Sequence, residues 1–290
     1  MTTVPTAAPE AASLPIPTPG HRPQPSTRAV VGGLLLRDLT VLDKSLGEFL
    51  HNTVTQPLLL VFVFTYLLPL LGQGMGGGTE AGASRFASLL MAGLIAQAMA
   101  FQGIFRVAVP MAREIDVTHE LEGRVMAPAS VFTLAGEKIL FGTLLAFFAA
   151  MVVFPAAAYI PSTPVYLIID WPVLLTLVPL ACLASAALGL TLGTVLKPSS
   201  VPMLAGTLAL PLAFGGCIFY TWGSLAPVPW LQYLVLINPI TYMSEGMRAA
   251  LFTANGVSHM PLPAVYGALA GFTVVLMFVG TVGFRRRVLL

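Results

Sequence analysis

Residues 172–196, PVLLTLVPLACLASAALGLTLGTVL, decide the fold, because this stretch is long, apolar and free of charged side chains. A helix needs about 20 mainly apolar residues to cross the hydrocarbon core of a bilayer. The bilayer core offers no water to bond with backbone groups, so such a stretch must satisfy them within a helix. The stretch therefore predicts a transmembrane helix.

The same pattern recurs along most of the chain. Charged residues make up only 9% of the sequence and the mean hydropathy is +0.87, which leaves too little charge for the surface of a soluble domain. The alternating pattern of a membrane β-barrel is absent. We therefore expect an all-α polytopic membrane protein with six transmembrane helices. The six predicted spans are 52–72, 86–109, 139–160, 172–196, 201–221 and 262–284.

The first 25 residues differ from the rest of the chain. They are rich in Pro, Ala and Thr and have no apolar segment of the kind found in signal peptides,. We predict a disordered cytoplasmic tail over residues 1–25 and a single transmembrane domain over residues 26–290.

The distribution of positive charge predicts the orientation. If the N-terminus is inside, 12 of the 14 Lys and Arg residues lie in inner segments, and only Arg85 and Arg248 lie outside. Cytoplasmic segments of membrane proteins carry such an excess. We expect a multi-pass protein of the plasma membrane with both termini cytoplasmic. A net charge of +2 gives no reason to expect nucleic acid as a partner,.

Residues 27–50 predict an amphipathic helix before the first span. Leucines recur there at spacings of three and four, and Arg37, Asp38 and Lys44 fall between them,. Such a helix lies along the inner membrane surface. It could serve only as an anchor, or it could transmit force from a cytoplasmic partner.

Residues 111–130, between the second and third predicted spans, hold the densest charge in the chain. The segment is either a solvated loop or a docking surface for a soluble protein; its side chains lack the spacing of metal ligands. The third span then opens with Gly136-Glu137-Lys138, from which the Lys138 side chain can extend to the inner membrane surface. The charged residues of the loop are Arg113, Glu114, Asp116, His119, Glu120, Glu122 and Arg124.

Residues 222–260 are apolar but too interrupted by proline to form a span. Asn238-Pro239 predicts a turn into a short helix over 240–252, with Glu245 and Arg248 one turn apart on it,. Irregular apolar backbone at membrane depth must pack against protein or line a cavity. We therefore predict a re-entrant helical hairpin on the outer side, stabilised by these four polar and proline positions.

Two groups of residues are candidates for the substrate path. Gln97 and Gln102 are the polar residues of the second span, which also carries Phe101; buried amides join helices or contact cargo,. Trp and Tyr cluster on the predicted outer side, where they anchor the protein in the headgroup layer or form an exit rim for an amphiphile. The aromatic candidates are Tyr220, Trp222 and Tyr233.

Several kinds of site are absent from the sequence. It has no G-x-x-x-x-G-K-[ST] phosphate loop, no G-x-S-x-G turn and no H-E-x-x-H motif,. The two cysteines, Cys182 and Cys217, fall in predicted spans and are interpreted as packing residues. We therefore expect no enzyme activity, no metal site and no cofactor in this chain. No ionisable residue lies at the centre of a span, which argues against a proton- or sodium-coupled pump.

Two stretches carry a resemblance to a known family. One is REIDVTHELEGRVMAPAS, residues 113–130, followed by Gly136-Glu137-Lys138; the other is INPITYMSEGMRAAL, residues 237–251. Together they resemble the membrane permease subunit of type-2 ABC exporters, the class that includes daunorubicin-type drug and lipid exporters. The second stretch is similar to the family's N-P-[hydrophobic]-T-Y-x-x-E-x-x-R signature. The Pro-rich N-terminal tail is longer than in the family.

The resemblance implies a mechanism. Two permease halves, identical or related, would pair with two separate ATPase subunits that hold ATP and Mg²⁺. A short helix within residues 113–126 would be the coupling helix seated in the ATPase, and residues 27–50 would form the interface helix. The substrate would be a hydrophobic drug or a lipid-linked molecule. The alternatives are an ion- or proton-coupled transporter or channel without an ATPase, and a membrane scaffold without transport.

Overall fold

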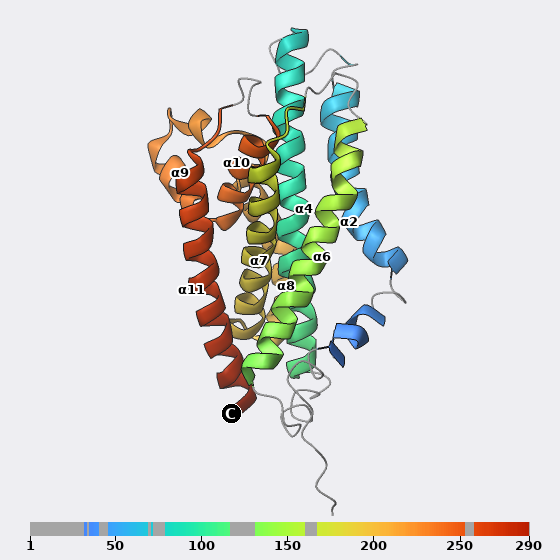
Figure 1. The fold of residues 1–290 in the computed structure, drawn as a ribbon, viewed down its shortest axis with the longest axis vertical. Coiled ribbons are helices and arrows are strands. Elements are labelled where there is room, and N and C mark those ends of the chain that lie inside the picture. Colours follow the sequence, from blue (N-terminus) through green and yellow to red (C-terminus); the bar gives the residue numbers. More distant parts are fainter. Residues whose placement is uncertain are drawn as a thin grey trace, which may run out of the picture.

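The computed structural model describes residues 32–33, 35–40, 46–68, 71, 79–116, 131–159, 167–252 and 258–289. Nearly all of these residues are helical, and within these ranges the only strand-like contact is an isolated bridge between Ile168 and Phe252. The long helices form one bundle, seen from the side in Figure 1. The prediction of an all-α fold is confirmed for this part of the chain.

The described chain consists of α-helices of different lengths and a few short π and 3₁₀ segments. The α-helices are α2 (Leu46–Val61), α4 (Glu80–Asp116), α6 (Val131–Tyr159), α7 (Trp171–Val195), α8 (Val201–Phe214), α9 (Pro229–Leu234), α10 (Pro239–Leu251) and α11 (Leu262–Leu289). The short segments are η1 (Phe62–Leu67), which is π-helical, and the 3₁₀ turns η2 (Pro198–Ser200), η3 (Trp222–Leu225) and η4 (Val235–Ile237).

Four helices in the described part of the chain are long and apolar enough to cross a membrane. They are Ala81–Glu114, Phe132–Tyr159, Trp171–Val195 and Leu262–Arg287, within α4, α6, α7 and α11. They coincide with four of the six predicted spans. The chain is therefore a multi-pass membrane protein.

The other two predicted spans are helical but interrupted. The first continues from α2 into the π-helical η1, and the fifth stops when α8 ends after 14 residues at Phe214. Fourteen residues are too few to cross the hydrocarbon, which needs about 20. Gly215 and Gly216 follow α8, and glycine favours the end of a helix. The count of six spans stays a prediction.

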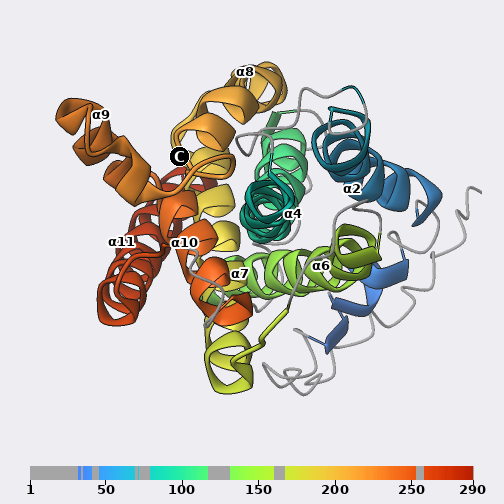
Figure 2. The same ribbon diagram turned by 90° about the horizontal axis from the view of Figure 1, so that it is seen from above.

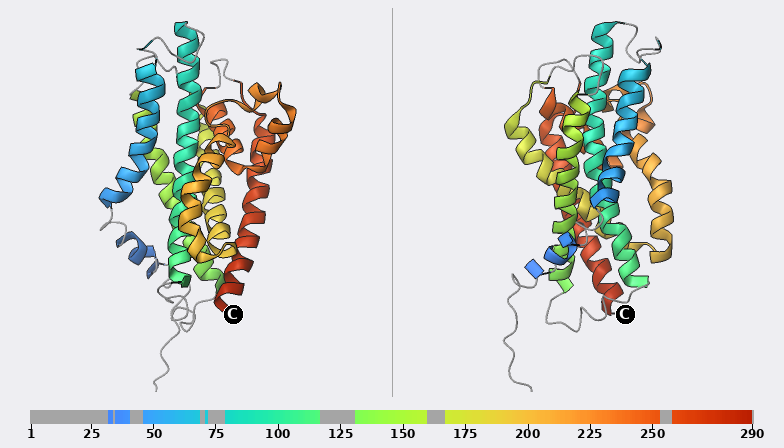
Figure 3. Two further views of the ribbon diagram at one scale, coloured as in Figure 1. Left: turned by 180° about the vertical axis from the view of Figure 1, so that it is seen from behind. Right: turned by 90° about the vertical axis from the view of Figure 1, so that its right-hand side faces the viewer.

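Helix α7 lies at the centre of the packing. It contacts α4 and α6 on one side and α11 on the other, while α10 lies against α4, α7 and α11. Seen from above in Figure 2, α2 and α8 flank α4 on different sides. The side views in Figure 3 show α8 rising only part of the way along the bundle.

Glycine brings α4 and α7 into close contact. A methyl group on Gly189 would lie 2.5 Å from the Ile104 carbonyl oxygen, and one on Gly103 would lie 1.9 Å from the Ser185 Oγ. Helices in lipid gain stability from such close packing because no hydrophobic force drives them together. The α4–α7 contact therefore leaves no room for a larger side chain.

Helix α11 is tied to α7 by hydrogen bonds as well as by packing. The Thr191 hydroxyl donates to the Leu276 carbonyl at 2.8 Å, and Arg287 Nε donates to the Thr194 carbonyl at 3.1 Å. A guanidinium at the C-terminus of a helix also compensates the helix dipole. The helices α4, α7 and α11 therefore form one connected unit.

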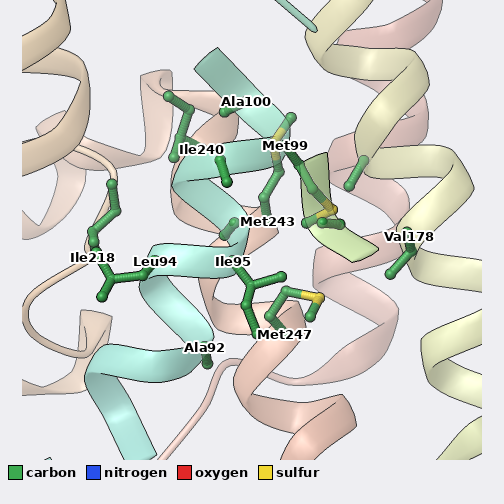
Figure 4. Packing of buried hydrophobic residues seen from close by; sticks show 14 of the residues in the cluster. Ala92, Leu94, Ile95, Met99, Ala100, Val178, Ile218, Ile240, Met243 and Met247 are labelled. Carbon is green, nitrogen blue, oxygen red and sulfur yellow. The ribbon is translucent and has the colours of Figure 1, made fainter. Parts of the chain in front are cut away.

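The main apolar core lies where α4, α6, α7, α10 and α11 meet. Figure 4 shows Ile95 and Met99 of α4 close to Met243 and Met247 of α10, and all four side chains are buried. Methionine fills irregular gaps of this kind because its chain is unbranched and polarisable. Every residue of α10 is buried, so this short helix belongs to the interior of the bundle.

The bundle has two ends that differ in composition. The end that carries α9 and α10 is called the α10 end, and the end where α4 and α11 finish is called the C-terminal end (Figure 1). Helix α4 has 37 residues, about 55 Å at 1.5 Å per residue, and it reaches both ends. Pro110 interrupts its hydrogen bonding near the C-terminal end,.

The predicted interface helix is described only in part. Residues 35–40 are helical, and residues 46–50 belong to α2, in one helix with the start of the first predicted span. Residues 1–31 and 41–45, including the predicted tail and Lys44, lie outside the described residues. A continuous amphipathic helix over 27–50 stays a prediction.

Candidate functional site

The first candidate site begins where α8 ends. The last carbonyl groups of a helix have no partner within it, and a buried carbonyl group needs a partner. After Phe214 the chain turns through residues 215–217, and Cys217 has a positive φ of 51°. Gly216, Cys217 and Ile218 are buried. Their carbonyl groups therefore require hydrogen-bond donors from another element.

Helix α10 supplies those donors. Asn238 Nδ2 donates to the Leu212 carbonyl at 2.9 Å, the Thr241 hydroxyl donates to Gly215 at 3.0 Å, and the Ser244 hydroxyl donates to Gly216 at 2.6 Å. Asn238 also caps α10 by accepting a bond from the Ile240 amide at 3.1 Å,. One side of α10 thus replaces the helical bonds that α8 loses.

A buried ion pair completes this contact. Arg248 Nη1 lies 2.9 Å from Glu245 Oε1, and both side chains are almost completely buried. The guanidinium also donates to the carbonyls of Cys217 and Ile218. Glu245 accepts from the backbone amides of Trp222 at 2.7 Å and Met260 at 2.8 Å. The pair therefore links α8, η3 and the chain before α11 to α10.

We call Asn238, Thr241, Ser244, Glu245 and Arg248 the α10 network. The sequence analysis chose Asn238, Pro239, Glu245 and Arg248 as structural residues, and the structure brings all four together at one end of the bundle. It did not choose Thr241 and Ser244. Positions 238, 241, 245 and 248 are spaced by three and four, so they share a helix face; this spacing could have found Thr241.

The second candidate site lies at the C-terminal end. Lys138 Nζ lies 2.9 Å from Glu114 Oε1 and 3.3 Å from Asp38 Oδ2. These three residues come from the start of α6, the end of α4 and the helical residues 35–40. We call them, together with the neighbouring Glu137, the inner joint. The expectation that Lys138 extends to the membrane surface is wrong, because its side chain is buried and paired.

The predicted coupling residues are described only at the end of α4. Arg113 is exposed, Glu114 belongs to the inner joint, and Asp116 is the last residue of the helix. Arg37, predicted for the interface helix, is exposed. The remaining predicted coupling residues lie outside the described residues. They are His119, Glu120, Glu122 and Arg124.

The candidate path residues on α4 do not form one surface. Gln97 is buried and its Oε1 has no hydrogen-bond partner among the described residues. Gln102 accepts a bond from Arg106 Nε at 3.3 Å, within the same helix. Phe101 is half-buried and stacks at a tilt against Phe105, with ring centres 5.4 Å apart.

The aromatic candidates at the α10 end also differ from one another in burial and in hydrogen bonding. Tyr220 is half-buried and donates to the Phe214 carbonyl, and the Trp222 indole donates to the Gln232 backbone carbonyl at 3.0 Å. Tyr233 on α9 is 69% exposed. Only Tyr233 therefore has a side chain free to meet a substrate or lipid without first breaking a described contact.

An aromatic cluster at the same end was not predicted. Phe64 of η1 lies between Phe86 of α4 and Phe219, with ring centres 6.5 and 6.0 Å away, and Phe219 contacts Phe214 at 5.2 Å. These rings join α2–η1 to the end of α8. Their sequence positions are far apart, so no local pattern predicts this cluster.

No site for a metal ion is evident in the part of the chain that the structure describes, where no three His, Cys, Asp or Glu side chains come together suitably. Cys182 and Cys217 are buried free thiols. The contacts described at both candidate sites are hydrogen bonds and ion pairs, which join helices to one another.

Comparison with known families decides what these sites belong to. The model of the ABC-2 type transporter family matches residues 43–252, which is more than half of the chain and includes both the inner joint's α4 and α6 residues and the α10 network. The chain belongs to the ABC-2 type transporter family. A comparison with curated proteins returned no match.

As an ABC-2 permease, the chain is a transmembrane component of a transporter and not itself a catalytic enzyme. Permeases of this family generally work with ABC ATPase partners. Membership confirms the resemblance recognised in residues 113–130 and 237–251. The ABC-2 permease therefore has two contacts of interest: the α10 network bonds to the chain that follows α8, and the inner joint connects α4, α6 and residues 35–40.

Proposed function

We propose that this chain is the membrane subunit of an ATP-driven exporter for a hydrophobic or amphiphilic substrate. A separate subunit binds ATP and Mg²⁺ and hydrolyses the nucleotide, and a second permease half, identical or related, completes the path. The protein resides in the plasma membrane with both termini in the cytoplasm. The ATP-dependent steps are proposals, as are the partners and the direction of transport.

The inner joint is the observation that carries the proposal. Lys138 connects α4, α6 and residues 35–40. Its partner Glu114 comes three positions before the segment 117–130, which holds the remaining charged residues of the predicted coupling region. An ATPase that moves this segment would pull on α4 through Glu114 and on residues 35–40 through Asp38. Movement would then reach the long α4 and the bundle around it.

The substrate class follows from the polarity of the bundle. The four candidate spans are long, strongly apolar helices. The phenylalanine cluster between η1, α4 and the end of α8 adds an apolar region at the α10 end. An amphiphile would partition into such surroundings, whereas a small ion would lose its hydration without gaining ligands.

The ATPase partnership is tested by co-expressing the chain with each ABC ATPase of its source organism and purifying through a tag on the permease. We expect one ATPase to co-purify and the Glu120→Lys/Glu122→Lys variant to lose it while still entering the membrane. Arg286→Gln, an exposed change at the C-terminal end, is the matched control. Full association and ATPase stimulation in the double variant would contradict the proposal.

The path proposal is tested at Tyr233, whose side chain is exposed at the α10 end. In the assembled complex, Tyr233→Ala should change substrate-stimulated ATP hydrolysis more than basal hydrolysis, with hydrophobic dyes as trial substrates. Trp171→Ala, which removes another exposed aromatic ring, is the control. Equal effects on both rates would assign Tyr233 to membrane anchoring.

The orientation is tested with reporters. A reporter fused after Leu290 should be active in the cytoplasm, and one inserted at Ser162 should be active outside. Signals of the opposite sign at both positions would overturn the proposed topology.

A further inference from the structure

The helical residues 229–237, which form α9 and η4, carry an exposed apolar face. It consists of Trp230, Tyr233, Leu234 and Ile237, which are 69%, 69%, 52% and 70% exposed. Residues three, four and seven positions apart share one side of a helix. The sequence has no Asp, Glu, Lys, Arg or His from residue 198 to residue 244, so no charged side chain belongs to this part of the chain. We call the four residues the α9 face.

The opposite side of this helix holds it to the bundle. Val235 is buried, and Leu236 packs against the main apolar core. The Thr241 hydroxyl donates to the Val235 carbonyl at 2.7 Å, and the Tyr242 hydroxyl donates to the Leu236 carbonyl at 3.1 Å. The α9 face therefore cannot turn inward without breaking these bonds.

The helix projects from the side of the bundle at the end of the spans. Figures 1 and 2 show α9 outside the long helices, beside the start of α11. Helix α11 begins at Leu262, and its candidate span begins at the same residue. Farther along this span, Val274 and Phe278 are exposed, and apolar side chains on the outside of a span face the acyl chains of lipid. The α9 face therefore continues the lipid-facing surface at the level where that surface ends.

Three surroundings are conceivable for the α9 face: water, a second protein and lipid. Water is unfavourable, because contiguous exposed apolar patches mark sites of contact. A stable protein interface takes about 20–30 residues a side, and four side chains are few for one. The headgroup layer fits best, since Trp and Tyr combine an apolar ring with a polar tip and gather there.

We propose that residues 229–237 form a lipid-contact helix in the leaflet at the α10 end. Trp230, Leu234 and Ile237 insert at the boundary between the headgroups and the acyl chains, the depth at which helices with an apolar face lie in a membrane surface. The bonds from Thr241 and Tyr242 then connect this leaflet to α10. The leaflet thereby holds the α10 end of the bundle at a fixed depth.

This lipid contact goes beyond the proposed function, because it requires neither a substrate nor an ATPase. It concerns Trp230, Leu234 and Ile237, and it holds whichever role Tyr233 has in the substrate path. Its tests use no nucleotide and no substrate. A failure would therefore leave the exporter proposal standing, and a failure of the exporter proposal would leave the lipid contact standing.

The first test is tryptophan fluorescence of the full-length protein in phosphatidylcholine vesicles. The difference between Trp171→Phe and Trp171→Phe/Trp230→Phe isolates the signal of Trp230, because half-buried Trp222 is present in both. Lipids brominated near the headgroup end of the acyl chain should quench this signal several-fold more strongly than iodide in the water does. Stronger quenching by iodide would place the helix in water and overturn the proposal. Protection from both quenchers would overturn it in favour of a second permease half.

The second test introduces a charge into the α9 face. In the Trp171→Phe protein, Leu234→Glu should withdraw the helix from the leaflet, because a carboxylate is costly in apolar surroundings. Iodide should then quench Trp230 more strongly and brominated lipid less. Arg85→Glu, at an exposed polar position of the same end, is the control and should leave both unchanged. Unchanged quenching in Leu234→Glu would overturn the proposal, and if this variant does not fold, the first test decides.

Discussion

The two ends of the bundle solve the problem of buried charge differently. At the α10 end, Glu245 and Arg248 form one pair whose remaining bonds go to backbone groups of three other segments. At the C-terminal end, Lys138 serves two carboxylates while Glu137 has no bond among the described residues. Among the described residues, the α10 end pairs one guanidinium with one carboxylate, whereas at the C-terminal end one ammonium group bonds to two carboxylates.

This difference indicates different roles. A balanced, fully buried pair that replaces missing helical bonds stabilises one arrangement, and breaking it is costly. A joint in which one ammonium group bonds to carboxylates of two separate segments depends on how those segments lie relative to each other. We therefore expect changes at the α10 end to affect folding first, and changes at the inner joint to affect movement and coupling first.

The largest effect is expected for Arg248→Ala. The change leaves Glu245 as a buried, unpaired charge and removes the donors to Cys217 and Ile218, so the free energy of unfolding should fall by about 3–5 kcal/mol. Denaturant unfolding in detergent measures the loss, and exposed Arg285→Ala is the control. Adding Glu245→Ala should cost less than the sum of the single changes. Strict additivity would show that the two residues are not partners.

Lys138→Met should have a smaller effect on stability and a larger one on coupling. It removes two bonds to charged groups, each less completely buried than the α10 pair, so we expect a loss of about 1.5–3 kcal/mol. The assembled transporter should hydrolyse ATP without matching transport. Lys197→Met, an exposed change near the same end, should leave both rates alone. Normal coupling in Lys138→Met would place force transmission elsewhere.

Gly189→Ala tests the close α4–α7 contact that connects the two ends. The new methyl group would meet the backbone carbonyls of Ile104 and Gly103, which cannot move away easily, so we expect a loss of about 1–3 kcal/mol. Gly271→Ala in α11, where no atom lies within 4 Å, should be neutral or slightly stabilising. Similar effects of the two changes in thermal unfolding would show that the contact is looser than described.

The smallest effect is expected for Thr241→Val. The shape is kept, but the Gly215 and Val235 carbonyls lose a donor, at a cost of about 1 kcal/mol. Thr207→Val removes an exposed hydroxyl that bonds only within α8, and it should not change stability in the same unfolding assay. No loss in Thr241→Val would show that α8 does not depend on α10 for its end.

Local patterns in the sequence predicted much of the fold. Apolar length alone located α4, α6, α7 and α11, and Asn238-Pro239 located the start of α10, because capping and helix length depend on neighbouring residues. The early end of α8 was harder to predict, because residues 201–221 remain apolar throughout. The chain turns after Phe214 because side chains of α10 donate hydrogen bonds to the carbonyl groups of the turn.

The sites were predictable only where their residues lie close in sequence. Glu245 and Arg248 are three positions apart on one helix, so helical spacing suggested the pair. Lys138 and Asp38 are 100 positions apart, and charge along the chain gives no sign of their contact. The phenylalanine cluster likewise depends on three distant segments that only the fold brings together.

Pro110 has a mechanical consequence for α4. It lies between Gly103, which contacts α7, and Glu114 in the last turn of the helix. Proline removes one hydrogen bond from a helix and favours bending there. The helix therefore has a point that favours bending between its Gly103 contact and Glu114. A displacement that reaches α4 through Glu114 can therefore be taken up in part as a bend at Pro110, before it reaches the close contact of Gly103 with α7,.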